Sequence, residues 1–172
     1  MEELDQAEGN NQGLIIEYAD SHRLSFSGEW EEDFKIKGVF IDRDGEKYEG
    51  PLFDDWPHGK GVYTFAVGEV YEGDFLDGER NGSGIYTFAN GGKYDGSWYN
   101  GKGHGIGEYR WADGSIYKGS YANSQKNGIG LFWFPRGTLY QGNYKDDKCD
   151  GLQIIQFKVS GVTVYAEYQD NE

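Results

Sequence analysis

The chain has 172 residues, of which only 37% are hydrophobic while 17% are aromatic, and 28 are glycines. A fold of two packed layers needs more leucine, isoleucine and valine, so a single sheet coated with aromatic rings fits this composition better. The formal net charge of −14 argues against nucleic acid and anionic lipid as partners, because both attract positive charge. Cys149 is the single cysteine, which excludes a disulfide framework and favours a reducing, cytoplasmic compartment.

The N-terminal part of the chain is the least regular. Residues 1–12 are acidic and polar and are expected to form a disordered tail, with neither a signal peptide nor an apolar run of membrane-spanning length. We assign residues 13–170 to one repeat array. Its first unit is a degenerate hairpin, predicted from strands at residues 14–18 and 24–30 with a turn near residues 20–22.

Five regular hairpins are predicted next, with turns at residues 43–45, 66–68, 89–91, 112–114 and 135–137. Between them we expect polar connectors, such as residues 76–81, 99–104 and 122–127. The last unit departs from the repeat pattern, since Gln153 and Ala166 stand where earlier units have glycine. Residues 164–168 are predicted to close the array. About seven hairpins, or about 14 strands, are therefore expected.

A fixed step of 23 residues organises the chain. The glycines in this step are Gly59, Gly82, Gly105, Gly128 and Gly151, and the tyrosines of a Tyr-x-Gly element follow it at Tyr48, Tyr71, Tyr94, Tyr117 and Tyr140. A constant period of this length is the signature of a repeat architecture.

The unit reads as a β-hairpin with a three-residue loop. Residues 84–88 and 94–98 are rich in aromatic and β-branched residues, and Ala89-Asn90-Gly91 between them predicts a type I turn followed by a left-handed glycine. This loop length places Tyr86 opposite Tyr94 and Gly84 opposite Gly96. The other pairs predicted in the same way are Tyr63–Tyr71 with Gly61–Gly73, Tyr109–Tyr117 with Gly107–Gly119, and Phe132–Tyr140 with Gly130–Gly142.

Glycine inside a strand marks the close approach of another group. We expect that group to be a ring of a neighbouring pair, or the ring of Phe75, Trp98, Tyr121 or Tyr144.

The segment YEGDFLDGERNGSGIYTFANGGKYDGSW, residues 71–98, resembles the MORN (membrane occupation and recognition nexus) repeat, and five units carry both halves of its motif. The resemblance implies an all-β fold, an elongated single-layer antiparallel sheet of stacked hairpins. It implies no catalysis by the repeats, so we expect a scaffold and no enzyme. Members of this family act in cilia, the cytoskeleton and cell junctions, and those built almost wholly of such repeats occur in radial spoke heads.

The sequence motifs give little support to a cofactor or metal site. Residues 96–102 have the glycine and lysine spacing of a phosphate-binding loop, but Gly103 stands where serine or threonine would bind magnesium. His58 and His104 occupy the same repeat position two units apart, roughly 19 Å at strand spacing, which is too far for a shared metal. We therefore expect no cofactor and no metal.

The aromatic stripe is the candidate site. One thin sheet cannot bury all of its rings, so we expect a partner helix or peptide to lie along it. The predicted groove residues are Tyr63, Tyr71, Tyr86, Tyr94, Trp98, Tyr109, Trp111, Tyr117, Phe132 and Tyr140.

The expected partners are other proteins, including axonemal subunits, in a cytoskeletal assembly, with the ciliary or flagellar axoneme as the first candidate. Two alternatives stay open. One is a peripheral membrane or phosphoinositide-binding module, which the negative net charge disfavours. The other is a regulatory subunit of a separate enzyme. Oligomer formation through end strands is also left open.

Overall fold

The computed structural model describes residues 14–17, 23–31, 34–158 and 160–168. The predicted tail at residues 1–12 and the predicted turn near residues 20–22 lie outside these ranges. The described residues form fifteen β-strands and no helix, and all pairings given for these strands are antiparallel. The predicted all-β fold of antiparallel hairpins is thus confirmed. No helix able to cross a membrane occurs in this described part of the chain.

The chain divides into two compact units, residues 1–79 and 80–172. In the first unit the hydrogen-bonded order is β1-β2-β3-β4-β6-β7, and the short β5 pairs with β4. The strands are β1 (Leu14–Glu17), β2 (Arg23–Glu31), β3 (Phe34–Asp42), β4 (Lys47–Phe53), β5 (Trp56–Pro57), β6 (Gly59–Thr64) and β7 (Val70–Leu76).

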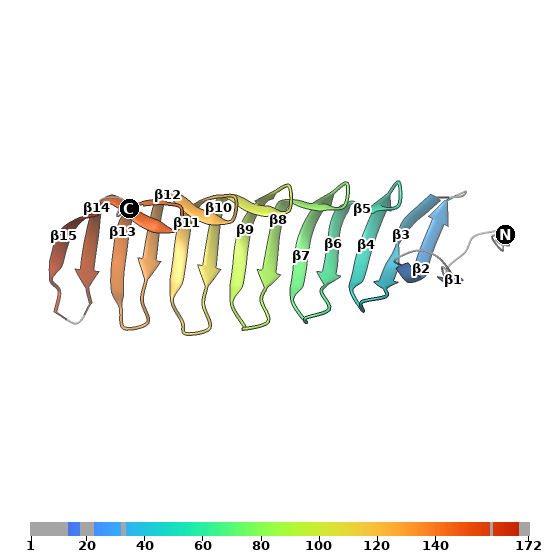
Figure 1. Ribbon diagram of the computed structural model, residues 1–172, viewed down its shortest axis with the longest axis horizontal. Coiled ribbons are helices and arrows are strands. Elements are labelled where there is room, and N and C mark those ends of the chain that lie inside the picture. The colour runs from blue at the N-terminus through green and yellow to red at the C-terminus, as the bar shows by residue number, and fades with distance from the viewer. Residues whose placement is uncertain (1–13, 18–22, 32–33, 159, 169–172) are drawn as a thin grey trace. The chain divides into compact units, whose positions relative to one another are not determined.

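In the second unit the strands again pair in chain order, from β8 to β15 (Figure 1). They are β8 (Glu79–Thr87), β9 (Lys93–Tyr99), β10 (Lys102–Arg110), β11 (Ile116–Ala122), β12 (Gln125–Trp133), β13 (Thr138–Lys145), β14 (Lys148–Phe157) and β15 (Thr163–Tyr168). Every strand thus bonds to the strand that follows it, which is the arrangement of stacked hairpins.

The predicted three-residue turns are confirmed. Between β8 and β9, the Gly91 amide donates to the Phe88 carbonyl and the Phe88 amide donates to the Gly92 carbonyl, both at 2.9 Å. Gly91 has φ +84°, in the left-handed region where a side chain would be strained. The same bonding pattern closes the turns at residues 43–45, 66–68, 112–114 and 135–137.

The prediction of polar loops at residues 76–81, 99–104 and 122–127 is wrong, because most residues of each segment lie in strands. Between β9 and β10, Tyr99 pairs with Lys102, and Asn100 and Gly101 form a two-residue turn with φ of 47° and 73°. Two successive positive φ values define the type I′ turn, which asparagine and aspartate tolerate. The equivalent turns are at residues 54–55, 77–78, 123–124 and 146–147.

The two-residue turns at residues 77–78, 100–101, 123–124 and 146–147 are each bonded to the connector of the preceding repeat. The Ser124 amide donates to the Gly103 carbonyl at 2.8 Å, and the Asp147 amide donates to the Lys126 carbonyl at 3.1 Å. In the second unit these connectors lie along the upper edge of the strands in Figure 1, opposite the three-residue turns. The connectors therefore form a second ladder of backbone bonds that links neighbouring repeats.

The predicted register is confirmed in all four hairpins. Tyr86 pairs with Tyr94 and Gly84 with Gly96, and the other pairs are Tyr63–Tyr71 with Gly61–Gly73, Tyr109–Tyr117 with Gly107–Gly119, and Phe132–Tyr140 with Gly130–Gly142. Because side chains alternate between the faces of a strand, these rings and glycines share one face, here called the ring face.

The group that approaches the paired glycines of the regular repeats is the tyrosine of the Tyr-x-Gly element itself, whereas the Gln153 side chain approaches Gly142. A Cβ atom added to Gly107 would lie 2.5–2.6 Å from atoms of the Tyr94 ring, and one added to Gly130 would lie 2.3–2.5 Å from the Tyr117 ring. Tyr94 thus lies across the paired glycines Gly96 and Gly107. The predicted ring of a neighbouring pair is therefore correct for Gly107, whereas the ring over Gly96 belongs to its own hairpin, and Trp98 and Tyr121 pack against this tyrosine in T-shaped pairs.

We predict that Gly107→Ala lowers the free energy of unfolding by about 1–3 kcal/mol, because the added methyl group displaces the Tyr94 ring from the backbone. Urea unfolding followed by circular dichroism measures this change. Ile106→Val is the matched control, since Ile106 is 60% exposed and its change should stay within about 0.5 kcal/mol. Equal stability of Gly107→Ala and the control would contradict the contact.

Candidate partner-binding surface

The first layer of rings on the ring face is a buried aromatic spine. In the second unit it comprises Trp98, Tyr94, Tyr121, Tyr117 and Tyr144, in which each ring meets the next edge to face with centroids 5.0–5.3 Å apart. None of these five residues is more than 7% exposed. In the first unit the same arrangement joins Tyr71, Phe75 and Tyr48. The spine is therefore core, and edge-to-face pairs add to its stability.

The spine tyrosines bond their hydroxyl groups to the backbone. Tyr48, Tyr71, Tyr94 and Tyr117 each donate to the carbonyl oxygen three residues later, at 2.7, 2.9, 3.0 and 3.2 Å. Burial raises the pKa of Tyr48, Tyr94 and Tyr117 to about 12. Burial also raises the pKa of Tyr121 and of Tyr144. These rings are held as neutral phenols.

A second row of rings follows the three-residue turns, and we call it the outer row. In the second unit neighbouring centroids lie 4.4–5.3 Å apart along Tyr86, Phe88, Tyr109, Trp111, Phe132, Phe134 and Tyr140. Tyr86 is buried, Phe134 is 41% exposed, and the other five are half-buried. The outer row is therefore a continuous aromatic strip that is only partly covered by the chain itself.

The first unit holds a shorter version of this row. Tyr63 and Phe65 stack with centroids 4.6 Å apart and are half-buried. The Tyr63 hydroxyl donates to the Glu46 carboxylate. Burial is the main cause that raises the pKa of Tyr63, and the hydrogen bond to Glu46 raises it further.

The ten predicted groove residues thus divide between the two rows. Five are buried, namely Tyr71, Tyr86, Tyr94, Trp98 and Tyr117, and have little surface to offer. The other five, Tyr63, Tyr109, Trp111, Phe132 and Tyr140, are half-buried members of the outer row. The prediction left out Phe65, Phe88 and Phe134, although they share the 23-residue step with Trp111.

Cations lie between the two rows. The Lys126 Nζ atom is 5.6–5.8 Å from four ring centroids, two in the spine (Tyr117 and Tyr144) and two in the outer row (Trp111 and Phe132). The Arg80 guanidinium lies 4.5 Å from the Trp98 centroid and 5.1 Å from that of Tyr86. Cations at such distances are attracted to the ring faces.

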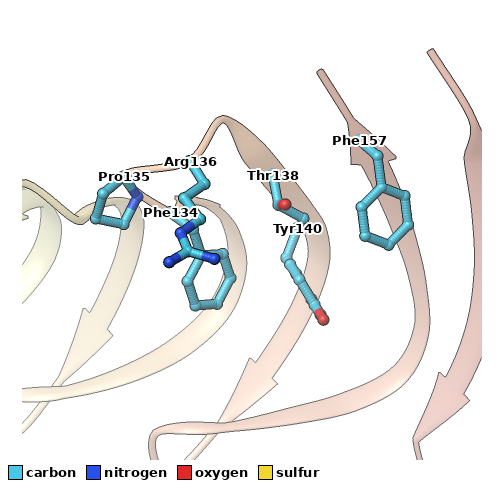
Figure 2. Close-up of a pocket in the computed structure, with 6 residues that line it drawn as sticks. All are labelled: Phe134, Pro135, Arg136, Thr138, Tyr140 and Phe157. Atoms are coloured by element: carbon cyan, nitrogen blue, oxygen red, sulfur yellow. The ribbon is translucent and has the colours of Figure 1, made fainter. Parts of the chain in front are cut away.

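The outer row ends at a hollow of about 390 Å³ (Figure 2). Its lining is Phe134, Pro135, Arg136, Thr138, Tyr140 and Phe157. In Figure 2, Tyr140 lies between Phe134, with Arg136 beside it, and Phe157. Aromatic walls with one cation at the rim suit an apolar or proline side chain of a partner segment better than a charged small molecule.

Histidines and acids form no comparable site. The His58 ring lies beside that of Phe53 in a tilted contact and 3.7 Å from Asp77, and the His104 ring lies beside that of Tyr99. Within the residues described, no group of three or more histidine, cysteine, aspartate or glutamate side chains is arranged to hold a metal ion. The aromatic face is thus the site that this structure offers for recognition.

Stacked hairpins with a glycine-supported ring face define a β-repeat protein. The model of the MORN repeat matches residues 48–70, 71–93, 94–116, 117–139 and 140–152, which is more than half of the chain. The chain therefore belongs to the MORN-repeat family. Comparison with curated proteins found no match.

Solved structures with a similar fold include the TCP domain of SAS-4 (dCPAP) of Drosophila melanogaster in complex with a proline-rich motif of Ana2 (dSTIL). The alignment covers 96% of this chain and 97% of that one, with a TM-score of 0.52 and 14% identity. At this identity the likeness concerns the fold alone.

The buried spine makes stability sensitive to alkaline pH. The pKa of Tyr94 and Tyr117 rises from 10.0 to about 12 on folding, so the folded state favours the neutral phenols. Their contribution to stability is complete below pH 10 and is lost as the pH rises toward 12. We predict that their ionisation coincides with loss of the β circular-dichroism signal. NMR of the tyrosine ring carbons follows each ionisation, and the variants Tyr94→Phe and Tyr117→Phe assign the two signals. Formation of both phenolates in the folded protein below pH 10 would contradict the prediction.

Proposed function

We propose that this chain is a non-catalytic interaction module that binds an extended or helical segment of a partner protein over the outer row of the ring face. The observation that carries the proposal is the continuity of the outer row, seven rings in contact with only one of them buried. Tyrosine and tryptophan are favoured anchors at protein interfaces because they bury a large area at low entropic cost.

The shape of the surface supports a peptide more than a folded domain. The row is one ring wide and ends in the hollow beside Phe134, so a narrow segment covers more of it than a flat surface would. The SAS-4 TCP domain, which has a similar fold, is in complex with a proline-rich motif. Proline-rich segments dock on aromatic grooves because their extended conformation is already formed before binding. We therefore place proline-containing segments first among the candidate partners.

A membrane surface is the weaker alternative. The net charge of −14 opposes binding to anionic lipid, to which each basic residue near the surface contributes only about 1 kcal/mol. Charged side chains on the opposite face, such as Lys60 with Asp74 at 3.0 Å, are paired with each other. Electrostatics therefore favours a protein partner.

We extend the proposal to a place in a cytoskeletal assembly, with the ciliary axoneme and its radial spokes as the first location to test. Its support is the resemblance to family members built almost wholly of this repeat. A tagged full-length chain expressed in ciliated cells tests it, and diffuse cytoplasmic signal with none along the cilium would contradict it. A regulatory subunit of a separate enzyme is the remaining alternative, and the partner's identity decides between the two.

The double substitution Tyr109→Ala with Phe132→Ala should weaken partner binding at least tenfold, because it removes two central rings of the outer row. The probe is a peptide selected on the full chain from a random linear-peptide display library, and titration calorimetry gives the Kd. Tyr109 and Phe132 are half-buried, so a β circular-dichroism spectrum should persist.

The matched control is Tyr99→Ala, which removes a ring that is 59% exposed and lies on the opposite face. Its Kd should equal that of the unmodified chain. Selected peptides that bind the double variant and the unmodified chain equally well would refute the assignment to the outer row.

A further inference from the structure

The hollow at the end of the outer row forms where the repeat pattern breaks. Ile155 stands 23 residues after Phe132, at a position that holds a ring in the preceding repeats. Phe134 therefore has no ring of the next repeat to stack on, whereas the corresponding pairs of the two preceding repeats have centroids 5.1–5.3 Å apart. The foot of the turn is also less covered, since Thr138 is half-buried while Ser115, one repeat earlier, is only 4% exposed. The missing ring thus leaves the space of about 390 Å³.

A glutamine keeps Tyr140 out of the spine and in the wall of this hollow. Gln153 stands where the earlier repeats have the second glycine of a pair, and a Cβ atom added to Gly142 would meet its amide group. The Gln153 Nε2 atom donates to the Asn143 carbonyl at 2.6 Å, and this carbonyl lies three residues after Tyr140. Gln153 thereby takes both the glycine and the carbonyl that a spine tyrosine would use. Tyr140 is half-buried instead and meets Phe134 edge to face with centroids 5.2 Å apart.

The rim of the hollow carries two cations. Arg136 lines it (Figure 2), Lys158 belongs to the next turn, and both are exposed. A Cβ atom added to Gly137 would lie 2.8–3.4 Å from carbons of the Lys158 side chain, so this lysine lies against the turn that holds Arg136. No ion pair joins either cation to another residue in the described ranges. Residues 134–138 and 157–162 contain no acid, whereas acids lie in or beside the turns of three earlier repeats, at Asp44, Glu69 and Asp113.

We propose that the hollow receives an apolar side chain of the partner segment, and that an aspartate or glutamate beside it in that segment pairs with Arg136 and Lys158. This inference rests on the proposed function and names the chemistry of the partner at the end of the outer row. The lining supplies ring faces for the apolar side chain, and the two cations supply donors for the carboxylate. Exposed charges more than about 8 Å away are screened at physiological ionic strength, so these cations outweigh the net charge of −14 at the rim.

Charge reversal by Arg136→Glu with Lys158→Glu tests the pairing. Both side chains are exposed, so the β circular-dichroism spectrum should persist. The probes are peptides selected from the display library on the unmodified chain, whose binding is lost in the Tyr109→Ala with Phe132→Ala variant. They should bind the reversed variant at least tenfold more weakly. Replacing their acidic residue by lysine should restore at least fivefold of the affinity for the reversed variant, which a merely structural effect of the substitutions would not do.

The matched control is Lys102→Glu with Lys148→Glu, which makes the same change in charge at two exposed positions beside the two-residue turns. These turns lie at the opposite edge of the strands from the hollow (Figure 1), and the effect on the Kd should be less than twofold. A second arm leaves the protein unmodified and replaces single residues of the peptide. Alanine at the apolar residue beside the acid, and the corresponding amide at the acid itself, should each weaken binding at least fivefold.

The outcomes separate the two proposals. If no selected peptide depends on Tyr109 and Phe132, the proposed function fails, and this inference fails with it. If peptides depend on those rings but bind the reversed variant as well as they bind the control, the hollow takes no acidic anchor, while the peptide-binding function stands. Tighter binding to the reversed variant would indicate that the rim serves an acidic segment of this chain or of a second copy, such as residues 169–172, and would equally overturn the inference.

Discussion

The whole fold depends on one contact, the tyrosine ring that lies flat on a pair of glycines in adjacent strands. Tyr94 can approach the backbone only because Gly96 and Gly107 have no side chains, and its hydroxyl then reaches the Ser97 carbonyl. Tyr48 and Tyr117 make the same contact with their own glycine pairs, and each spine ring of the second unit packs edge to face on the next. A core is thereby built on one face of a sheet, and the described residues form no second layer of secondary structure over it.

This way of building a core leaves the outer row partly uncovered. Once the spine has occupied the glycine strip, the rings nearer the three-residue turns, such as Trp111 and Phe132, can stack only on each other. Cations such as Lys126 fill the angle between the two rows. The same geometry that stabilises the array therefore leaves a strip of half-buried rings, which is the surface that we propose a partner covers.

The sequence predicted much of the fold, because the period and the turn chemistry are local. Gly91 and its equivalents fixed the turn type, and the turn fixed the register of Tyr86 with Tyr94. The connectors were mispredicted because Asn100-Gly101 was interpreted as a polar loop, whereas it forms a type I′ turn inside a longer pair of strands. The division of rings into spine and outer row was missed, because the burial of a spine ring such as Tyr94 depends on its contact with Gly107 of the next hairpin, which the sequence of one repeat does not show.

The accessibility of individual rings tests the central contact most directly. NMR of selectively labelled aromatic residues, with a soluble paramagnetic probe, reports the exposure of each ring in the folded chain. Our account predicts that resonances of Tyr94 and Tyr117, which are 4% and 0% exposed, resist broadening while those of Trp111 and Phe132 are broadened. Equal broadening of Tyr94 and Trp111 would contradict it, since the tyrosine would then not lie on its glycines.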